Sequence, residues 1–153
     1  MVDRDAILEL TAAHEVETSP LDGEALDRLL AEAFHVGLAD DGRAAFLIAF
    51  AESADYASPN FLWLRRRLSR FVYVDRVVVA PAARGQGLAR GLYREVFDRT
   101  LASGRSIVCC EVNKVPPNEA SDRFHAALGF GEIGQEGTPD GKKRVRYLAR
   151  TIG

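Results

Sequence analysis

The 153-residue sequence has little of what several classes of protein require. Its only two cysteines, Cys109 and Cys110, are adjacent and its three histidines are scattered, so the ligand spacings of a zinc site are absent. The 20 basic and 22 acidic residues give a net charge of −2, whereas a dedicated nucleic-acid-binding domain is usually strongly basic. No apolar run is long enough to cross a bilayer, and residues 1–20 lack the basic and apolar regions of a secretory signal.

What remains is an ordinary globular composition, with 47% apolar and 27% charged residues. The length allows one domain with a substantial core and is too short for two, so we expect a single domain over residues 1–153. We expect a cytoplasmic protein with no metal, nucleic-acid or membrane partner. Neighbouring residues of a strand point to opposite faces, so the two cysteines are predicted to be separate buried thiols.

Hydrophobic periodicity predicts an α/β (α+β) order of elements. The predicted helices cover residues 3–14, 19–33, 85–101 and 118–128, and the predicted strands cover 34–39, 43–51, 71–79, 106–113, 130–136 and 143–150. The helix over 19–33 is expected to begin at a Ser19 cap followed by Pro20. The helix over 118–128 is expected to begin at an Asn118 cap and to stop at Gly129. The central strand–helix–strand–helix unit predicts a parallel strand pair with helices packed on the sheet. The strands over 34–39 and 43–51 are expected to form a hairpin, and those over 130–136 and 143–150 a closing pair around a turn.

The least regular stretch is 53–70, where aromatic residues stand beside several arginines. We interpret it as a short amphipathic helix or lid with a solvated basic face. Its arginines (Arg65–Arg70), together with the basic C-terminal end, also allow a nucleic-acid-binding hypothesis, which predicts strongly salt-dependent affinity.

The most informative segment joins the strand over 71–79 to the helix over 85–101. Two closely spaced glycines, Gly85 and Gly87, stand where that helix begins. Glycine lets backbone amides approach a ligand, and a helix N-terminus offers unpaired N–H groups with a partial positive charge. The junction therefore predicts a phosphate or pyrophosphate site, with a tight packing turn as the alternative. Neither the dinucleotide fingerprint, which meets Arg90 at its third glycine position, nor a kinase-type phosphate loop is matched.

Two motifs resemble those of the GNAT superfamily of acyl-CoA-dependent N-acyltransferases. The first matches the family signature Arg/Gln-x-x-Gly-x-Gly/Ala after a strand, and reads Arg84-Gly85-Gln86-Gly87-Leu88-Ala89. The second follows in family order as Asn118, Ser121, Phe124-His125 and Leu128-Gly129-Phe130. The resemblance covers roughly residues 34–150 and implies the GNAT fold, a mixed sheet of about six to seven strands with about four helices. The first predicted helix begins at residue 3, so we expect the family's usual first strand to be short or missing here.

The resemblance also implies that acetyl-CoA is the acyl donor. The backbone amides of residues 84–89 would bind its pyrophosphate. The pantetheine would lie along Val77, Val78 and Val79, in a gap where this strand splays from the strand over 106–113. The other side of the cofactor would be lined by Asn118, Ser121 and Phe124.

His125 occupies the position where the family usually has a tyrosine that protonates the departing CoA thiolate. An imidazole has a pKa near neutrality and is able to act as this acid. A histidine that only packs or forms hydrogen bonds is the alternative.

The acceptor amine must also lose a proton before it attacks. Asp75 and Glu111 are carboxylates within otherwise apolar strands, where a buried charge requires a partner or a function. Each is therefore a candidate base, with an ion pair to Arg76 or Arg123 as the alternative. Strand periodicity places Asp75 on the same face as Tyr73 and Val77, and Glu111 on the face of Cys109 and Asn113.

Together these inferences predict an N-acetyltransferase that moves an acetyl group from acetyl-CoA to a primary amine of a small molecule, amino acid derivative or peptide. The amine would attack directly in a ternary complex, without an acyl-cysteine. Glu15, Tyr56 and Trp63 are expected in the acceptor pocket because loops before the core strands shape it in this family. The alternative function is a CoA-binding sensor or pseudoenzyme, and a homodimer is a further possibility because dimers are common in the family.

Overall fold

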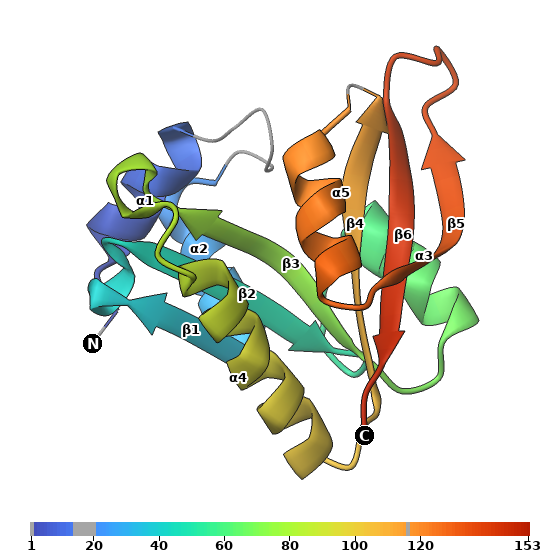
Figure 1. The fold of residues 1–153 in the computed structure, drawn as a ribbon, viewed down its shortest axis with the longest axis horizontal. Helices are drawn as coiled ribbons and strands as arrows, with labels where there is room; N and C mark the ends of the chain where they lie inside the picture. Colours follow the sequence, from blue (N-terminus) through green and yellow to red (C-terminus); the bar gives the residue numbers. More distant parts are fainter. Residues whose placement is uncertain (1, 14–20, 116) are drawn as a thin grey trace.

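The computed structural model describes residues 2–13, 21–115 and 117–153, and these form one layered α/β unit (Figure 1). The described helices are α1 (Arg4–Ala13), α2 (Gly23–Glu32), α3 (Pro59–Arg67), α4 (Leu88–Ala102) and α5 (Glu119–Ala127), with single 3₁₀ turns at Asp40–Gly42 and Pro81–Ala83. The strands are β1 (His35–Ala39), β2 (Ala45–Ala51), β3 (Val72–Val79), β4 (Ile107–Val115), β5 (Gly131–Gly137) and β6 (Arg144–Thr151). The predicted mixed fold is confirmed, with five α-helices in these ranges instead of about four.

The six strands form one sheet in the order β1-β2-β3-β4-β6-β5. Only the central pair, β3 and β4, is parallel, and the other neighbours are antiparallel. The two hairpins that the sequence predicts, β1–β2 and β5–β6, are both present. Because α4 connects the two parallel strands, the predicted strand–helix–strand unit forms the centre of the sheet.

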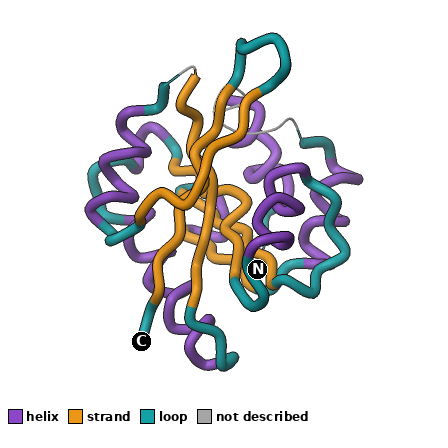
Figure 2. The backbone as a smooth tube through the Cα atoms, turned by 90° about the vertical axis from the view of Figure 1, so that its right-hand side faces the viewer, coloured by secondary structure: helices purple, strands orange, loops and turns teal. Residues whose placement is uncertain are grey.

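Helices cover both faces of the sheet (Figure 2). On one face, α1, α2 and α3 bury Ile7, Leu26 and Phe61 against the strands. On the other face, α4 and α5 contribute a second core that includes Leu92 and Leu128. We call these the α1–α3 face and the α4–α5 face. No helix in the described ranges is long and apolar enough to span a membrane.

The ends of two helices show which capping signals decide the local structure. Asp22 caps α2, because its Oδ1 accepts a hydrogen bond from the backbone N–H of Ala25 at 2.8 Å. The prediction of a Ser19 cap and a first turn at Pro20 falls outside the described residues, and the described helix begins later. Asn118 caps α5 as predicted, and Gly129 follows this helix with φ = 88°, a left-handed conformation that favours glycine.

The stretch 53–70 contains a short helix, α3, rather than a lid. Its Phe61, Trp63 and Leu64 are buried in the α1–α3 face, whereas Arg65–Arg67 are exposed. The predicted amphipathic helix with a solvated basic face is therefore present, and it packs under the sheet.

Candidate active site

The two parallel strands diverge at the centre of the sheet. β3 and β4 pair only at Val72 with Val108 and at Tyr73 with Cys109, and Figure 1 shows them separating beyond that point. The gap contains a cavity of about 110 Å³. The cavity is lined by residues 74–77 of β3, residues 110–113 of β4, Tyr93 of α4, the α5 cap Asn118, and Ser121 and His125 of α5. The splaying implied by the sequence resemblance is thus a feature of the fold.

A larger groove of about 560 Å³ continues from this gap to the start of α4. It shares Val77, Ser121 and His125 with the smaller cavity, so the two form one path. Its remaining lining includes Val79, the loop into α4 and the α5 residue Phe124. Of the candidate cofactor residues, Val78 packs instead into the α1–α3 face, Asn118 lines the smaller cavity, and Gln86 is an exposed loop residue.

The two glycines of the loop line this groove. Gly85 has φ = 81° and Gly87 has φ = 74°, values that other residues rarely adopt. A Cβ added at either position would meet no protein atom within 4 Å. The space beside these glycines is therefore available to a ligand, and packing of helix against strand does not explain them. Gly87 is also the N-cap of α4 and supplies no side-chain cap, so the first N–H groups of the helix are suited to an anionic ligand.

A bulge in β3 changes which residues share a face. Ile48 of β2 pairs with Arg76 and Ala49 pairs with Val74, so Asp75 is an extra residue in the register. Asp75 consequently lies on the α1–α3 face beside Arg76, whereas Val77 packs on the α4–α5 face. The prediction that Asp75 and Val77 share a face is therefore wrong, because strict alternation ends at the bulge.

Asp75 forms a buried ion pair. Its Oδ2 lies 2.7 Å from Nε of Arg76, both side chains are 5% exposed, and its Oδ1 accepts a hydrogen bond from the Tyr56 hydroxyl at 2.5 Å. The ion pair with Arg76, which the sequence analysis gave as an alternative to a catalytic role for Asp75, is thus present. Because Asp75 has two strong partners, its carboxylate is held in place as a charge that acts on neighbouring groups.

Glu111 lies on the same face but has no ion-pair partner among the described residues. Its Oε2 accepts a hydrogen bond from the Tyr73 hydroxyl at 2.7 Å, and Asn60 also bonds to it. Removal from water and the nearby charge of Asp75 raise the pKa of Glu111 to about 8, although these two hydrogen bonds and one from the backbone act in the opposite direction. A carboxyl group with this pKa is able to take up and release a proton near neutral pH.

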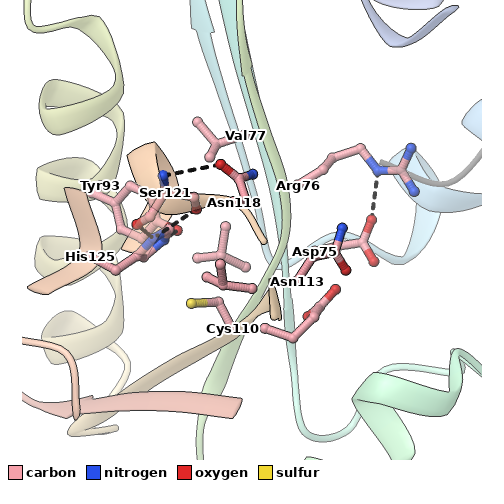
Figure 3. A pocket seen from close by; sticks show the side chains of 12 residues that line it. Asp75, Arg76, Val77, Tyr93, Cys110, Asn113, Asn118, Ser121 and His125 are labelled. Atoms are coloured by element: carbon pink, nitrogen blue, oxygen red, sulfur yellow. Dashed lines mark hydrogen bonds and ion pairs between the residues drawn. The ribbon is translucent and has the colours of Figure 1, made fainter. Parts of the chain in front are cut away.

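His125 lies on the opposite side of the gap (Figure 3) and is 4% exposed. Its Nδ1 is 2.8 Å from the backbone oxygen of Ser121, which only accepts hydrogen bonds, so Nδ1 carries the proton. Its Nε2, 2.6 Å from the Tyr93 hydroxyl, must then accept a hydrogen bond from Tyr93. Burial lowers the pKa of His125, which favours this neutral form.

Tyr93 is therefore a site residue that the sequence analysis did not identify as one. It stands at helical spacing with Leu92 and Val96 in the helix predicted over 85–101, and its ring packs with them in the core of the α4–α5 face. The sequence does hold one sign of this role. A tyrosine in a buried stripe requires a hydrogen-bond partner for its hydroxyl, which indicates a polar neighbour. Burial raises the pKa of Tyr93 well above its usual value, so it stays protonated.

The cysteines are separate buried thiols, as predicted. Cys109 packs on the α1–α3 face and Cys110 on the α4–α5 face, where it lines the gap. Burial raises the pKa of both thiols, so neither forms the thiolate that an acyl-enzyme would need. In the described part of the chain, no group of three His, Cys, Asp or Glu residues is placed to hold a metal ion.

The three candidate acceptor-pocket residues have different outcomes. Tyr56 is bonded to Asp75 beside the gap. Trp63 lies further along the same face and stacks on Tyr147, with ring centroids 3.9 Å apart. Glu15 lies outside the described residues. Sequence reasoning did not identify Tyr73 or Asn60 as site residues, because their links to Glu111 depend on how β3 and α3 are placed beside β4.

Comparisons with known proteins agree with this geometry. The model of the acetyltransferase (GNAT) family matches residues 5–130. Phosphinothricin N-acetyltransferase of Streptomyces coelicolor is 30% identical over 102 residues, which is 66% of this chain and only about half (54%) of that enzyme. Aminoglycoside N(6')-acetyltransferase type 1 of Serratia marcescens is 29% identical over 153 residues, or 97% of this chain and 93% of that protein.

Among solved structures, the ribosomal-protein-S18-alanine N-acetyltransferase of Escherichia coli has a similar fold. It superposes with a TM-score of 0.70 at 20% sequence identity, over 99% of this chain and 88% of the other. The matched sequence region includes the loop into α4, the β3–β4 gap and the α5 motif. The chain belongs to the GNAT family of acetyltransferases.

Proposed function

We propose that this protein transfers an acetyl group from acetyl-CoA to a primary amine by direct attack in a ternary complex. The observation that carries the proposal is the position of two proton-handling groups on opposite sides of one gap. Glu111 faces the α1–α3 side, and the Tyr93–His125 pair faces the α4–α5 side. Direct transfer needs a base for the attacking amine and an acid for the departing sulfur, and the gap has room between them.

The residues of the groove fit acetyl-CoA, which supplies the thioester when it is bound. The loop over residues 84–89, with its positive-φ glycines and the uncapped start of α4, would hold the pyrophosphate. Val77 and Val79 of β3 and Phe124 of α5 would line the pantetheine path. Beyond Tyr73, β3 has no pairing with β4, so its backbone N–H groups on that side are available to stabilise negative charge on the acetyl oxygen.

Glu111 would act as the general base. A substrate ammonium has a pKa of about 10, and a base with a pKa of about 8 is well matched to remove its proton near neutral pH. Asp75 would act indirectly, because its negative charge raises the pKa of Glu111. The Tyr73 hydroxyl and Asn60 would hold the Glu111 carboxyl group in place.

The acid function would be shared by His125 and Tyr93. The neutral His125 has no proton on Nε2, so it would position Tyr93 by accepting its hydrogen bond. Tyr93, which lines the gap, would then turn its hydroxyl to donate its proton to the departing sulfur. A proton from solvent would restore the hydroxyl after CoA leaves, and Glu111 would release to solvent the proton that it took from the amine. This division of roles follows from the proton on Nδ1, and it assigns to a helix α4 residue what the sequence motif assigned to His125 alone.

The test is CoA-thiol release from acetyl-CoA with and without a panel of small-molecule and peptide amines. Release that requires an amine, with formation of the acetylated amine, supports the proposal. The alternative of a CoA-binding sensor predicts that CoA binds while no amine accelerates its release. Such a result, obtained with a panel that includes amino acids, short peptides and aminoglycosides, would overturn the proposed activity.

A further inference from the structure

A third cavity, of about 590 Å³, opens on the same face as Glu111. It lies between α3 and the β5–β6 hairpin, and Figure 1 places α3 behind these strands. Its walls include Asn60, Trp63, Arg66, Lys143, Arg144 and Tyr147. None of the roles proposed above uses this cavity as a whole.

The inner wall of this cavity is in direct contact with the proposed base. Tyr147 of β6 pairs with Glu111 of β4 in the antiparallel register, and its hydroxyl donates a hydrogen bond to Oδ1 of Asn60 at 2.9 Å. Asn60 also bonds to Glu111. A molecule whose amine reaches Glu111 would therefore have this cavity beside it.

The outer wall is positively charged. Arg66, Lys143 and Arg144 line it, against the single carboxylate of Glu136. Within the described residues, neither Arg66 nor Lys143 takes part in an ion pair, and Nε of Arg144 donates to the neutral Gln135. We call these three residues the cationic wall.

Two other charges near the cavity do not cancel the cationic wall. Asp140 keeps its negative charge, because the Thr138 hydroxyl and the Lys142 backbone donate to it at 2.6 and 2.9 Å, and this charge also acts on Lys143. Asp140 and Glu136 together are two negative charges against the three positive charges of the cationic wall. Asp75 does not line this cavity, and Arg76, 2.7 Å away, places a positive charge beside it. An anionic group that enters the cavity therefore meets more positive than negative charge.

Chain geometry sets the separation between the two ends of the site. Tyr147, which pairs with Glu111, is three residues from Arg144 along β6. At about 3.3 Å per residue this is roughly 10 Å. Flexible arginine and lysine side chains shorten the distance that a ligand must span. An amino acid derivative or short peptide is long enough to place an amine at one end and a carboxylate at the other.

We propose that the cationic wall binds an anionic group of the acceptor, so that the preferred acceptors are amines that carry a carboxylate or a similar anion within about 10 Å of the reacting nitrogen. This inference rests on the proposed acetyltransferase function and specifies its substrate class. The cationic wall contacts a part of the acceptor that does not react. Its effect on selectivity should therefore be seen in the KM of the acceptor.

The test compares three acceptors that differ only in one side chain: the dipeptide amides Ala-Glu-NH2, Ala-Gln-NH2 and Ala-Lys-NH2. Acetylation of the α-amine is followed by mass spectrometry, because the Lys side chain is a second primary amine. We expect kcat/KM to be at least tenfold higher for the Glu peptide than for the Gln peptide, and lowest for the Lys peptide. Added salt should reduce the preference, because screening weakens exposed charge interactions. In the double variant R66Q/K143Q the ratio of Glu to Gln peptide should fall below about twofold, through KM.

The control variant is Arg94→Gln, which removes an exposed arginine of α4 with no role in the site. It should keep the full preference, and retained turnover of the Gln peptide by R66Q/K143Q would show that the double variant is folded. If all three peptides react equally, if the Lys peptide reacts best, or if the double variant keeps the preference, the inference fails and the acetyltransferase function stands. If no amine is acetylated although acetyl-CoA binds, the proposed function fails and the inference falls with it.

Discussion

Replacing Glu111 with glutamine tests the proposed base with almost no change of shape. The amide keeps the size of the side chain and an oxygen that accepts the hydrogen bond of Tyr73, but it cannot take a proton from the amine. General-base catalysis typically contributes about 10²- to 10⁴-fold, so we expect kcat/KM to fall within that range while acetyl-CoA affinity is unchanged. Glu9→Gln, which alters an exposed carboxylate of α1, should leave activity unchanged.

The pKa of Glu111 also predicts the pH dependence of the reaction. With a pKa of about 8, only about one tenth of the molecules carry the ionised base at pH 7. Wild-type kcat/KM should therefore rise about tenfold per pH unit below pH 8 and level off above it, as measured by CoA-thiol release at saturating acetyl-CoA. The residual activity of Glu111→Gln should not show this rise.

The same substitution should stabilise the protein at high pH. In the unfolded chain the glutamate ionises near its ordinary pKa of 4.5, whereas the folded protein keeps the proton up to about pH 8. The folded state therefore binds more protons across this window, and the contribution of Glu111 to stability is lost as the pH rises through it, by at most about 5 kcal/mol. Thermal denaturation should show Glu111→Gln gaining in Tm over the wild type from pH 5 to pH 9. A variant with full activity, or one whose Tm advantage does not grow with pH, would refute the assignment of Glu111 as a buried base.

The remaining predictions concern the acid, the cofactor loop and the thiols. Tyr93→Phe and His125→Phe should both lower kcat more than they lower CoA affinity, and unchanged turnover in either variant would remove that residue from the acid function. Gly87→Val should abolish CoA binding, as measured by calorimetry. The control is Gly141→Val in the hairpin turn, where glycine has a similar φ of 72° and equal open space, and this variant should bind CoA normally. Retained CoA affinity in Gly87→Val would contradict the loop assignment. Cys110→Ser should not prevent turnover, and intact-protein mass spectrometry should detect no acetylated enzyme after incubation with acetyl-CoA alone.

Local patterns were sufficient to predict most of the elements. The run of β-branched residues in β3, the Asn118 cap and Gly129 at the end of α5 each have a local physical cause, and each prediction agrees with the structure. The register of β3 against β2 has no such local cause. The bulge at Asp75 depends on pairing with a strand about 25 residues earlier, so the face on which Asp75 lies was not predictable from alternation.

The candidate site shows the same division between local and long-range information. The glycines of the loop and the carboxylates within apolar strands are unusual in the sequence itself, and both lead to the gap. Tyr93, Tyr73 and Asn60 are ordinary residues for their positions, and they become site residues only because the fold brings their polar atoms to His125 and Glu111. The arginines of α3 were interpreted as a solvated face, and one of them, Arg66, lines a cavity only once the β5–β6 hairpin lies beside it.

The central claim is tested most directly by following a labelled acetyl group in a single turnover. Enzyme loaded with acetyl-CoA that carries a deuterated acetyl group is mixed with an acceptor amine, and both products are quantified by mass spectrometry. The proposed mechanism predicts one deuterated amide for each CoA released, formed rapidly by the wild type and at least about 100-fold more slowly by Glu111→Gln. Bound acetyl-CoA that yields no labelled amide with any amine, or equal rates in the two proteins, would contradict it.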